Sequence, residues 1–333
     1  MNIRDIARLA EVTPGTVSKV LNNYPDIGEA TRQHVLKIIE ENHFEPRGWQ
    51  KKAESSALRV GMVVESVFHP FYAELEDSLA VHLHNAGYIH LLFHDNYFSQ
   101  DKQEKLSEMI SFFQPEKLMA LIYIGGNFAQ VPQEYFSQLP CPTIFINTVL
   151  PYPAGATGYS SVEISHYETA LAQMNLIISE KHRHICTVIS SAIDNSVYSR
   201  RYSAYRTALA DAGLPVYPFV ETDYQPEKAY GAMREYIRAH PETTAVCCGT
   251  DIVAPAILRA IRDEGLRPGE DVRLLSFDGL RHMKYCIPSV STFEQPAQDI
   301  VRYTLRLMED LIAGRQQHQH ITFRPLLKRR ESF

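Results

Sequence analysis

The stretch I-R-D-I-A-R-L-A-E-V-T-P-G-T-V-S-K-V-L-N-N, residues 3–23, combines two short helix patterns with a turn between them. The first pattern places apolar residues at i, i+3, i+4 and i+7, on one face of a helix: Ile3, Ile6, Ala7 and Ala10. Thr13 is a good N-cap for the second helix, and Pro14 suits its first position because the missing N–H costs nothing there. The stretch therefore predicts helices at 3–10 and 14–21.

This arrangement has the spacing of a helix-turn-helix, although any small helical subdomain can show it. A third helix is predicted from Glu29 to Asn42. DNA binding requires that the first turn of the second helix be exposed and small enough to enter the major groove. The side chains that this helix would offer are Thr13, Pro14, Gly15, Thr16, Ser18 and Lys19.

From Leu58 onward, apolar runs of strand length alternate with amphipathic helix patterns. The first series begins with L-R-V-G-M-V-V (58–64), and a second begins after residue 160 and includes I-C-T-V-I-S (185–190). Two successive series predict an α/β fold with two doubly wound parallel sheets. Ligands of such sheets bind outside the carboxyl ends of the strands, so two facing lobes would share a cleft. Residues 46–57 lack apolar periodicity and are predicted to be a linker with excess positive charge.

The composition is typical of a globular protein with two or three domains: 333 residues, 45% hydrophobic and 22% charged. No apolar run approaches the roughly 18 residues that span a bilayer. Charges at Arg4, Asp5 and Arg8 interrupt any signal-peptide pattern, and the five cysteines are scattered, so we expect a cytoplasmic protein with reduced thiols. Residues 1–60 hold nine Lys/Arg against eight Asp/Glu, so nucleic-acid binding would need a local basic face rather than bulk charge.

Motifs of enzymes and metal sites are not found. The sequence contains no G-x-S-x-G, no G-x-x-x-x-G-K-[ST] and no G-x-G-x-x-G after a strand. The histidine pairs at 82/84, 182/184 and 318/320 are spaced i, i+2, and such pairs do not share a helix face. We therefore expect no catalytic residue, no cofactor and no metal. The alternatives to a DNA-binding regulator are a sugar-binding protein and a carbohydrate-active enzyme, and the first would carry a signal peptide in place of the helical head.

The helical head resembles that of the lactose/galactose repressor family. The resemblance rests on residues 3–23, on E-A-T-R-Q-H-V-L-K-I-I-E-E (29–41) and on F-E-P (44–46). It implies that Pro14, Gly15 and Lys19 lie where the family reads bases, with Lys19 in place of the usual Arg. A lysine lacks the planar fork of a bidentate guanine contact, so direct readout is expected to be thin. Phosphate contacts are implied for Asn2, Arg4, Thr16, Ser18, Asn22 and Thr31.

The linker departs from the family pattern. Family members usually carry a short hinge helix there, with a leucine that wedges into the minor groove. That position falls on Ala53, and Gly48 weakens a helix. Trp49 either replaces the wedge or packs on the core. Lys51 and Lys52 still supply positive charge for phosphates, so DNA binding is expected without the usual strong kink.

The remainder of the chain resembles the ligand-binding core of the same family, which is similar to periplasmic sugar-binding proteins. The matching segments include H-P-F-Y-A-E-L (69–75), T-A-V-C-C-G-T-D (244–251), V-R-L-L-S-F-D-G (272–279) and S-V-S-T-F-E-Q-P (289–296). A polyol site needs aromatic planes for C–H faces, and acids, amides and arginine for hydroxyls. The resemblance implies this set of effector-binding residues: His69, Phe71, Tyr72, Asn147, Ser165, Arg201, Thr250, Asp278 and Gln295.

Each of these residues also has an ordinary structural interpretation. Phe71 and Tyr72 would serve equally as core aromatics, Arg201 as a solvated helix residue, and Asp278 as a helix N-cap. The family pattern also changes at several positions: His69 replaces Asn, Asp or Ser, Asn147-Thr148 replaces Asp-Arg, Ser165-His166 replaces Asp-Asn, and Thr250 replaces Asn. Because two carboxylates and an arginine are lost, we expect a neutral and less usual ligand.

The sequence thus predicts a homodimeric DNA-binding transcriptional regulator, most consistent with a repressor that binds a pseudo-palindromic operator. The domains are expected at 1–45 (helix-turn-helix head), 46–58 (hinge) and 59–333 (effector-binding core). Within the core, the N-lobe is expected at about 59–160 and 294–319, and the C-lobe at about 161–291 and 321–333. A small molecule, a sugar or sugar derivative, would bind between the lobes and change the operator affinity through hinge motion.

Overall fold

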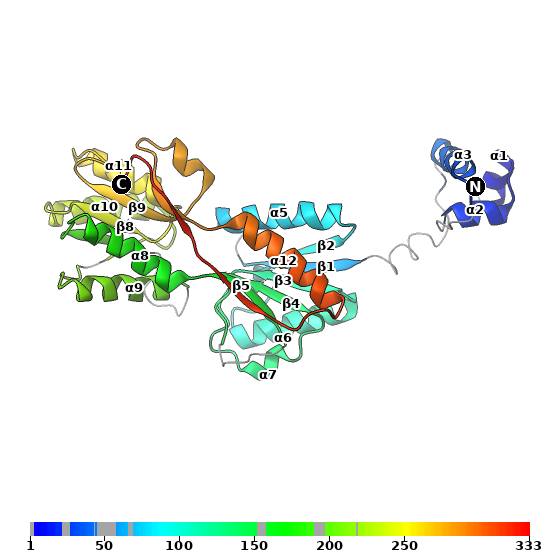
Figure 1. The fold of residues 1–333 in the computed structure, drawn as a ribbon, viewed down its shortest axis with the longest axis horizontal. Helices are drawn as coiled ribbons and strands as arrows, with labels where there is room; N and C mark the ends of the chain where they lie inside the picture. The colour runs from blue at the N-terminus through cyan, green and yellow to red at the C-terminus, as the bar shows by residue number, and fades with distance from the viewer. Residues whose placement is uncertain are drawn as a thin grey trace. The chain divides into compact units, whose positions relative to one another are not determined.

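A computed structural model describes residues 3–21, 27–42, 44, 58–65, 69–151, 158–189, 197–217 and 219–333 (Figure 1). The chain divides into two compact units, Met1–Ala57 and Leu58–Phe333. Within the described residues, no helix is both long and apolar enough to cross a membrane.

The first unit is the predicted three-helix head. Its helices are α1 (Ile3–Leu9), α2 (Pro14–Leu21) and α3 (Glu29–Glu41). The backbone N–H of Thr16 donates to the Thr13 hydroxyl at 3.1 Å, which confirms Thr13 as the residue that caps α2. The apolar faces of the three helices meet in a small core of Ile6, Ala7, Ala10, Val17, Val20, Val35 and Phe44.

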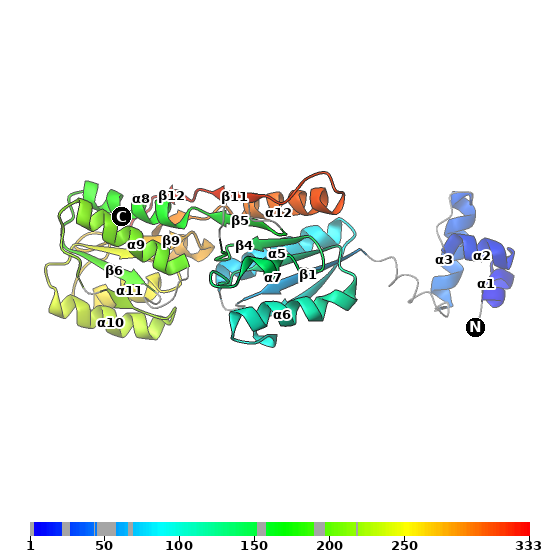
Figure 2. The same cartoon turned by 90° about the horizontal axis from the view of Figure 1, so that it is seen from below.

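The second unit contains the two predicted parallel sheets, each covered by helices (Figure 2). The N-lobe is built on the sheet β11-β5-β4-β3-β1-β2, in which every pairing is parallel. Its strands are β1 (Arg59–Val64), β2 (Ile89–His94), β3 (Ala120–Ile124), β4 (Thr143–Ile146), β5 (Ser160–Ile164) and β11 (His320–Phe323). Its helices are α5 (Pro70–Asn85), η1 (Asp95–Tyr97), α6 (Lys102–Phe113), η2 (Gln114–Glu116), α7 (Gln133–Phe136) and α12 (Ala297–Ile312).

Alternate residues of the N-lobe strands enter two different hydrophobic cores. Met62 and Val64 of β1 pack in one cluster with Leu75 and Leu79 of α5. Val63, between them in sequence, packs with residues of α6 on the opposite face. This two-residue alternation explains why the strands read as continuous apolar runs, since both faces of the sheet are buried.

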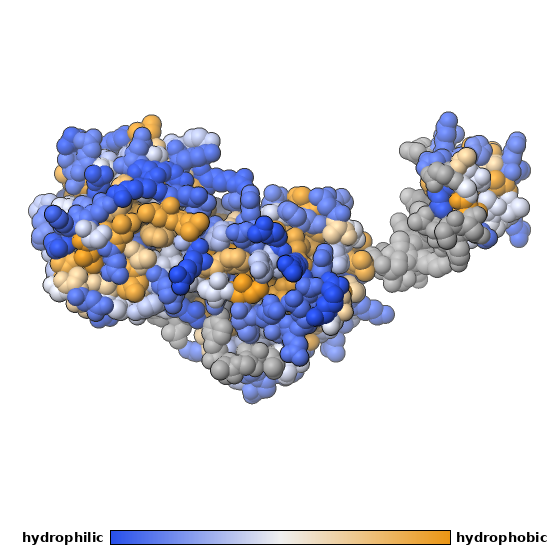
Figure 3. Space-filling model, in the orientation of Figure 1, coloured by the Kyte–Doolittle hydropathy of each residue, from blue (hydrophilic) through white to orange (hydrophobic). Residues whose placement is uncertain are grey.

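The C-lobe is built on the sheet β12-β10-β9-β8-β6-β7. Its strands are β6 (Ile185–Ile189), β7 (Val220–Glu221), β8 (Ala245–Cys248), β9 (Arg273–Asp278), β10 (Ser291–Glu294) and β12 (Leu326–Lys328), of which β12 is antiparallel to β10. Its helices are α8 (His166–Ser179), α9 (Val197–Asp211), α10 (Pro226–Ala239), α11 (Ala254–Asp263) and η3 (Arg281–Tyr285). Figure 3 shows hydrophilic residues over most of one face of the second unit, with apolar residues gathered in patches between them.

In the part of the second unit that the structure describes, the chain crosses between the lobes three times, and the crossings lie a few residues from the expected positions. Residues 161–164 belong to the N-lobe through β5, and residues 321–323 belong to it through β11. Residue 294 belongs to the C-lobe, because β10 pairs with β9 up to Glu294. The strands β5, β10 and β11 continue for as long as their backbone groups pair with a neighbouring strand. The crossings come directly after these strands, at 165, 295–296 and 324–325.

Candidate nucleic-acid interface and ligand cleft

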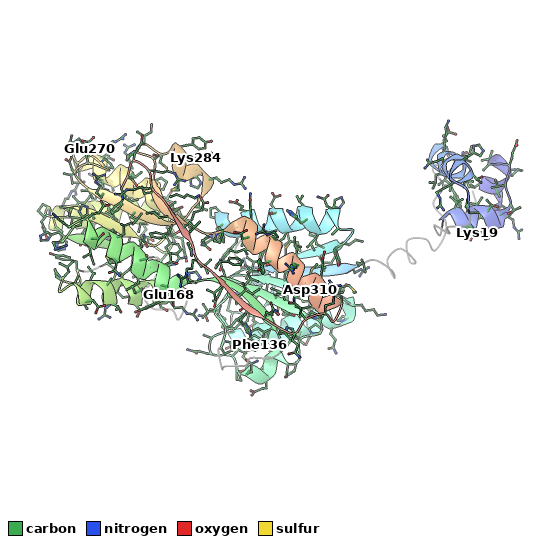
Figure 4. The ribbon with its side chains drawn as sticks, viewed as in Figure 1. Lys19, Phe136, Glu168, Glu270, Lys284 and Asp310 are labelled. Atoms are coloured by element: carbon green, nitrogen blue, oxygen red, sulfur yellow. The ribbon has the colours of Figure 1, made fainter. Side chains whose placement is uncertain are left out.

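The exposed face of the head carries the side chains expected to contact nucleic acid. Pro14, Gly15 and Lys19 of α2 are exposed, and Figure 4 shows Lys19 on this helix. Arg4 of α1 is also exposed, and Thr31 of α3 is partly exposed. The structure therefore brings the predicted base-reading residues together on one short helix.

Capping already engages part of this surface. The hydroxyls of Thr13 and Thr16 are hydrogen-bonded to each other at 2.9 Å, in addition to the bond from the Thr16 N–H. Ser18 is partly exposed. The predicted contacts of Asn2, Asn22, Lys51, Lys52 and Ala53, and the alternatives for Trp49, lie outside the described residues.

Aromatic residues lie on the N-lobe side of the candidate site, at the start of α5. The rings of His69 and Tyr72 are stacked, with centroids 4.4 Å apart and planes 25° apart. Phe71 is buried in the main hydrophobic cluster and is one of its core aromatics. Burial lowers the pKa of His69, and the charge of Arg201 lowers it further while Asp278 opposes. His69 is thus a neutral imidazole close to charged groups of the C-lobe.

Asp278 is the centre of the C-lobe part of the site. It ends β9, is 1% exposed, and has a φ of 116°. Its Oδ1 accepts hydrogen bonds from Gln295 at 2.9 Å and from Arg201 at 3.4 Å, and its Oδ2 accepts one from Thr250 at 2.8 Å. Asp278 is therefore not a helix N-cap, and the four residues predicted from different parts of the chain do meet.

Arg201 is buried among four partners rather than solvated. It is 2% exposed, pairs with Asp278, donates to the carbonyl oxygen of Gly249, and lies 3.7 Å over the centre of the Phe277 ring. Its Nε also donates to Nδ1 of His166 at 3.3 Å. The planar guanidinium meets these partners at fixed angles, which a flexible lysine would not reproduce.

The contact with Arg201 also determines the state of His166. Because a guanidinium only donates, Nδ1 of His166 must accept, which leaves the ring proton on Nε2. Burial lowers the pKa of His166 well below its ordinary value, and Arg201 and Arg200 lower it further, so the ring is neutral. The sequence pointed to His166 only as a departure from the family pattern.

Asn147 links the N-lobe to this network. It follows β4, and its Nδ2 donates to Oε1 of Gln295 at 2.9 Å. Its Oδ1 accepts from the backbone N–H of Ile164 at 3.2 Å, which determines the orientation of the amide. Asn147 has a φ of 47°, a left-handed conformation that asparagine tolerates better than most residues. An unbroken path of hydrogen bonds therefore runs from Asn147 through Gln295 to Asp278.

Ser165 does not join this path. Its hydroxyl bonds to the hydroxyl of Thr169 one turn along α8, at 3.2 Å. Ser165 precedes α8 without a side-chain cap hydrogen bond. The hydrogen bond of its side chain thus lies away from the network.

Three residues near the cleft were missed because only their positions at strand ends pointed to them. Tyr224 follows β7 and meets His69 edge-on with centroids 5.9 Å apart; Asp223 and Tyr224 have φ values of 46° and 60°. Both φ values lie in the left-handed region, which residues other than glycine rarely adopt. Glu65 follows β1, and its Oε2 accepts from the backbone N–H of Gly126 at 2.7 Å.

Asp251 binds the backbone that directly follows Asp278. Its Oδ2 accepts the backbone N–H groups of Gly279 and Leu280 at 2.7 and 2.8 Å, and its Oδ1 accepts the Thr292 hydroxyl at 2.9 Å. Burial and the nearby charge of Asp278 raise the pKa of Asp251 to about 7. Asp251 therefore positions the turn after Asp278.

The two lobes are also joined at their surface. Arg281 of η3 donates from Nε and Nη2 to Oε1 of Glu74 on α5, at 3.0 and 2.7 Å. No group of three His, Cys, Asp or Glu side chains suited to a metal ion occurs within the ranges that the structure describes. The arrangement is thus suited to binding through hydrogen bonds and aromatic faces.

Comparisons with known proteins agree with this architecture. Residues 2–47 match the family of bacterial regulatory proteins named lacI, and residues 175–333 match a periplasmic binding protein-like domain. The chain is 27% identical to the HTH-type transcriptional regulator MalR of Clostridium butyricum over 335 residues, covering 100% of this chain and 99% of that protein. It is 26% identical to the catabolite control protein A of Priestia megaterium, covering 92% and 91%.

Solved structures share the fold. The Lac repressor bound to ONPG in the repressed state is similar with a TM-score of 0.82 and 17% identity, covering 100% of this chain and 99% of that one. The complex of the transcriptional regulator CelR with cellobiose is similar with a TM-score of 0.69 and 23% identity, covering 99% of both chains. The chain thus carries the DNA-binding domain of the lacI family of bacterial regulatory proteins at residues 2–47, joined to a core that matches a periplasmic binding protein-like domain at residues 175–333.

Proposed function

We propose that this regulator acts as a homodimeric repressor of transcription, and that a sugar or sugar derivative bound between the lobes changes its affinity for a pseudo-palindromic operator. DNA binding through the lacI head is the property of the family, and the protein is not an enzyme. It would act in the cytoplasm, where its operator is.

A single observation carries the ligand-controlled part of this proposal. The path Asn147–Gln295–Asp278 joins the end of β4 in the N-lobe to the end of β9 in the C-lobe, with bonds of 2.9 Å at both steps. The amides and carboxylate that would bind hydroxyl groups bond instead to one another. A ligand that exchanges these bonds for its own binds the two lobe arrangements unequally, which is the condition for shifting an equilibrium between them.

The chemistry of the surrounding groups favours a carbohydrate. Tyr72, His69 and Tyr224 offer aromatic faces and edges, while Arg201, Asp278 and Gln295 offer donors and acceptors for hydroxyl groups. Similar structures include CelR with cellobiose and a LacI family regulator from Arthrobacter with lactose. A neutral sugar fits the loss of charged residues that the sequence shows.

The head would bind one half-site of the operator. We propose that Lys19, Pro14 and Gly15 face the base edges, and that Arg4, Thr16, Ser18 and Thr31 contact phosphates. A single helix-turn-helix buries little surface, so tight binding requires two heads on one operator. A sugar-binding protein without a regulatory role is disfavoured, because such a protein has no use for a lacI head at residues 2–47.

The test combines two measurements on the full chain. Light scattering and footprinting on an operator selected from random duplexes give the oligomeric state and the length of DNA protected. A dimer that protects two half-sites is expected, whereas a monomer on a single half-site contradicts the proposal. Sugars that bind are identified because they raise the melting temperature of the protein. Gel shifts with and without these sugars then test whether the ligand changes the affinity for the operator.

A further inference from the structure

Glu65 lies at the carboxyl edge of the N-lobe sheet, directly after β1. Its side chain is partly exposed, and its Oε2 accepts the backbone N–H of Gly126 at 2.7 Å. That bond fixes one carboxylate oxygen against the loop after β3. In doubly wound sheets this edge is where ligands bind.

The side chains of Glu65 and Tyr72 both lie next to Gly125. A Cβ atom at Gly125 would lie 2.8 Å from Cε2 of Tyr72 and 2.9 Å from Oε2 of Glu65. The carboxylate and the aromatic ring therefore approach each other over the bare backbone of this glycine, which has a φ of 86°. Tyr72 is in turn stacked on His69, and His69 meets Tyr224 of the C-lobe. Glu65 thus lies beside the aromatic residues through which the N-lobe meets the C-lobe.

Charge distinguishes Glu65 from the other acids nearby. Asp278 is paired with Arg201, and Asp95 is paired with Lys105, whose side chain is 3% exposed. Glu65 takes part in no ion pair within the described part of the chain. Burial raises the pKa of Glu65 and the charge of Asp95 adds to this, while the Gly126 hydrogen bond, Lys102 and Lys105 oppose it. The carboxylate is therefore partly shielded from water and is not neutralised by a contacting cation in the described residues.

We propose that Glu65 determines specificity by binding paired hydrogen-bond donors of the effector, either adjacent hydroxyl groups of a neutral sugar or the ammonium group of an amino sugar. Both groups form charge-assisted hydrogen bonds with a carboxylate. An anionic sugar is excluded, because a second negative charge beside a partly buried carboxylate is repelled. This inference rests on the proposed function, since it assigns a role within the same cleft.

Calorimetric titration of the full chain tests the inference with defined probes. The neutral probes are glucose, cellobiose and lactose, the amino sugar is glucosamine, and the anionic probes are glucuronate and glucose 6-phosphate. Wild-type protein is expected to bind at least one neutral or amino sugar and neither anion. Glu65→Gln keeps an oxygen for the Gly126 N–H but loses the charge, and should weaken that binding about 10- to 100-fold. The same variant should bind the anionic probes more tightly than wild type does.

The matched control is Glu134→Gln, on the exposed surface of α7, which should leave every affinity unchanged. Equal sugar affinities in Glu65→Gln and wild type, or an anionic sugar as the best wild-type ligand, would overturn the role of Glu65. The proposed function would survive that result if the bound sugar still changed operator affinity. If the wild-type protein binds no neutral or amino sugar, the proposed role of Glu65 is overturned. If none of the probes alters the affinity for the operator, that result counts against the proposed function.

Discussion

Asn147 and Gln295 are joined by a hydrogen bond of 2.9 Å in which the asparagine amide donates. The direction of this bond is fixed at both ends. Asn147 uses its oxygen for the Ile164 N–H, and Gln295 uses its own amide N–H for Asp278. The family pattern that the sequence resembles has Asp at position 147, which would offer only acceptors here. An amide at this position therefore allows the lobes to be linked by their own side chains.

Replacing Asn147 by Asp should break this link. The carboxylate would face the Gln295 oxygen, and if the Gln295 amide rotated to donate to it, the bond to Asp278 would be lost instead. One buried hydrogen bond is lost in either case, so the free energy of unfolding should fall by about 1–3 kcal/mol. Urea denaturation of the full chain measures this change.

A double-mutant cycle provides the control for that prediction. Asn147→Ala and Gln295→Ala should show an interaction energy of about 0.5–3 kcal/mol, as residues in one hydrogen-bonded network do. Strictly additive effects would show that the two side chains do not stabilise each other, and the link between the lobes would then have to be abandoned.

Arg201→Ala should destabilise the core as well as remove a ligand contact. The substitution leaves the Asp278 carboxylate buried, 1% exposed, without its cation. Removing one partner of a buried ion pair typically costs about 3–5 kcal/mol. Thermal unfolding should show the loss. Arg200→Ala is the matched control, since Arg200 is 34% exposed and lies 3.8 Å from Glu163; it should cost at most about 1 kcal/mol. Similar losses in the two variants would contradict the buried role of Arg201.

The raised pKa of Asp251 predicts how the stability of the protein depends on pH. Burial and Asp278 raise its pKa to about 7 from an ordinary value of 3.8. Between these values the folded protein holds a proton that the unfolded chain has released, so this contribution to stability is full at low pH and is lost as the pH rises through about 7. The melting temperature of wild type relative to that of Asp251→Asn should therefore be highest at low pH. This difference should fall as the pH rises and should be lowest above pH 7. A difference that does not vary between pH 4 and pH 8 would exclude the raised pKa.

Lys19→Ala should weaken operator binding by about 1–3 kcal/mol and relax discrimination at one base pair in each half-site. Lys19 is exposed on the helix expected to enter the major groove. Lys37→Ala serves as the control, because Lys37 is 72% exposed on α3, within 3.8 Å of Glu41. Fluorescence anisotropy with single-base operator variants measures both effects, and an equal loss on all sequences would assign Lys19 to a phosphate contact instead.

The head and the two sheets were predictable because short-range patterns determine them. The i, i+3, i+4 stripe at Ile6 and Ala10, the Thr13 cap and the apolar run of β1 each depend on fewer than ten neighbouring residues, and each is found in the structure. The helices of the C-lobe follow from the same periodicity. The crossings between lobes depend on where strand pairing ends, which the local pattern does not contain.

The ligand cleft was predictable only in part, because its contacts join distant segments. Phe71 and Tyr72 are adjacent in sequence and both are buried in the same hydrophobic cluster, but successive helical residues point about 100° apart, and Tyr72 stacks on His69. The pairing of Arg201 with Asp278 spans 77 residues and has no local signal. Glu65 and Tyr224 could have been suspected only from their positions after strands β1 and β7.

The central claim is that a sugar bound between the lobes changes the affinity of the protein for its operator. The most direct test is the operator affinity of the full chain, measured by anisotropy with and without a saturating sugar identified by calorimetry. We expect the affinity to change by about 5- to 150-fold, the usual range of coupling between two sites. Thr250→Val, which removes one hydrogen bond to Asp278, should reduce the sugar affinity and leave the affinity of the sugar-free protein for the operator unchanged. An operator affinity that is identical with and without bound sugar would contradict control of this regulator through the cleft.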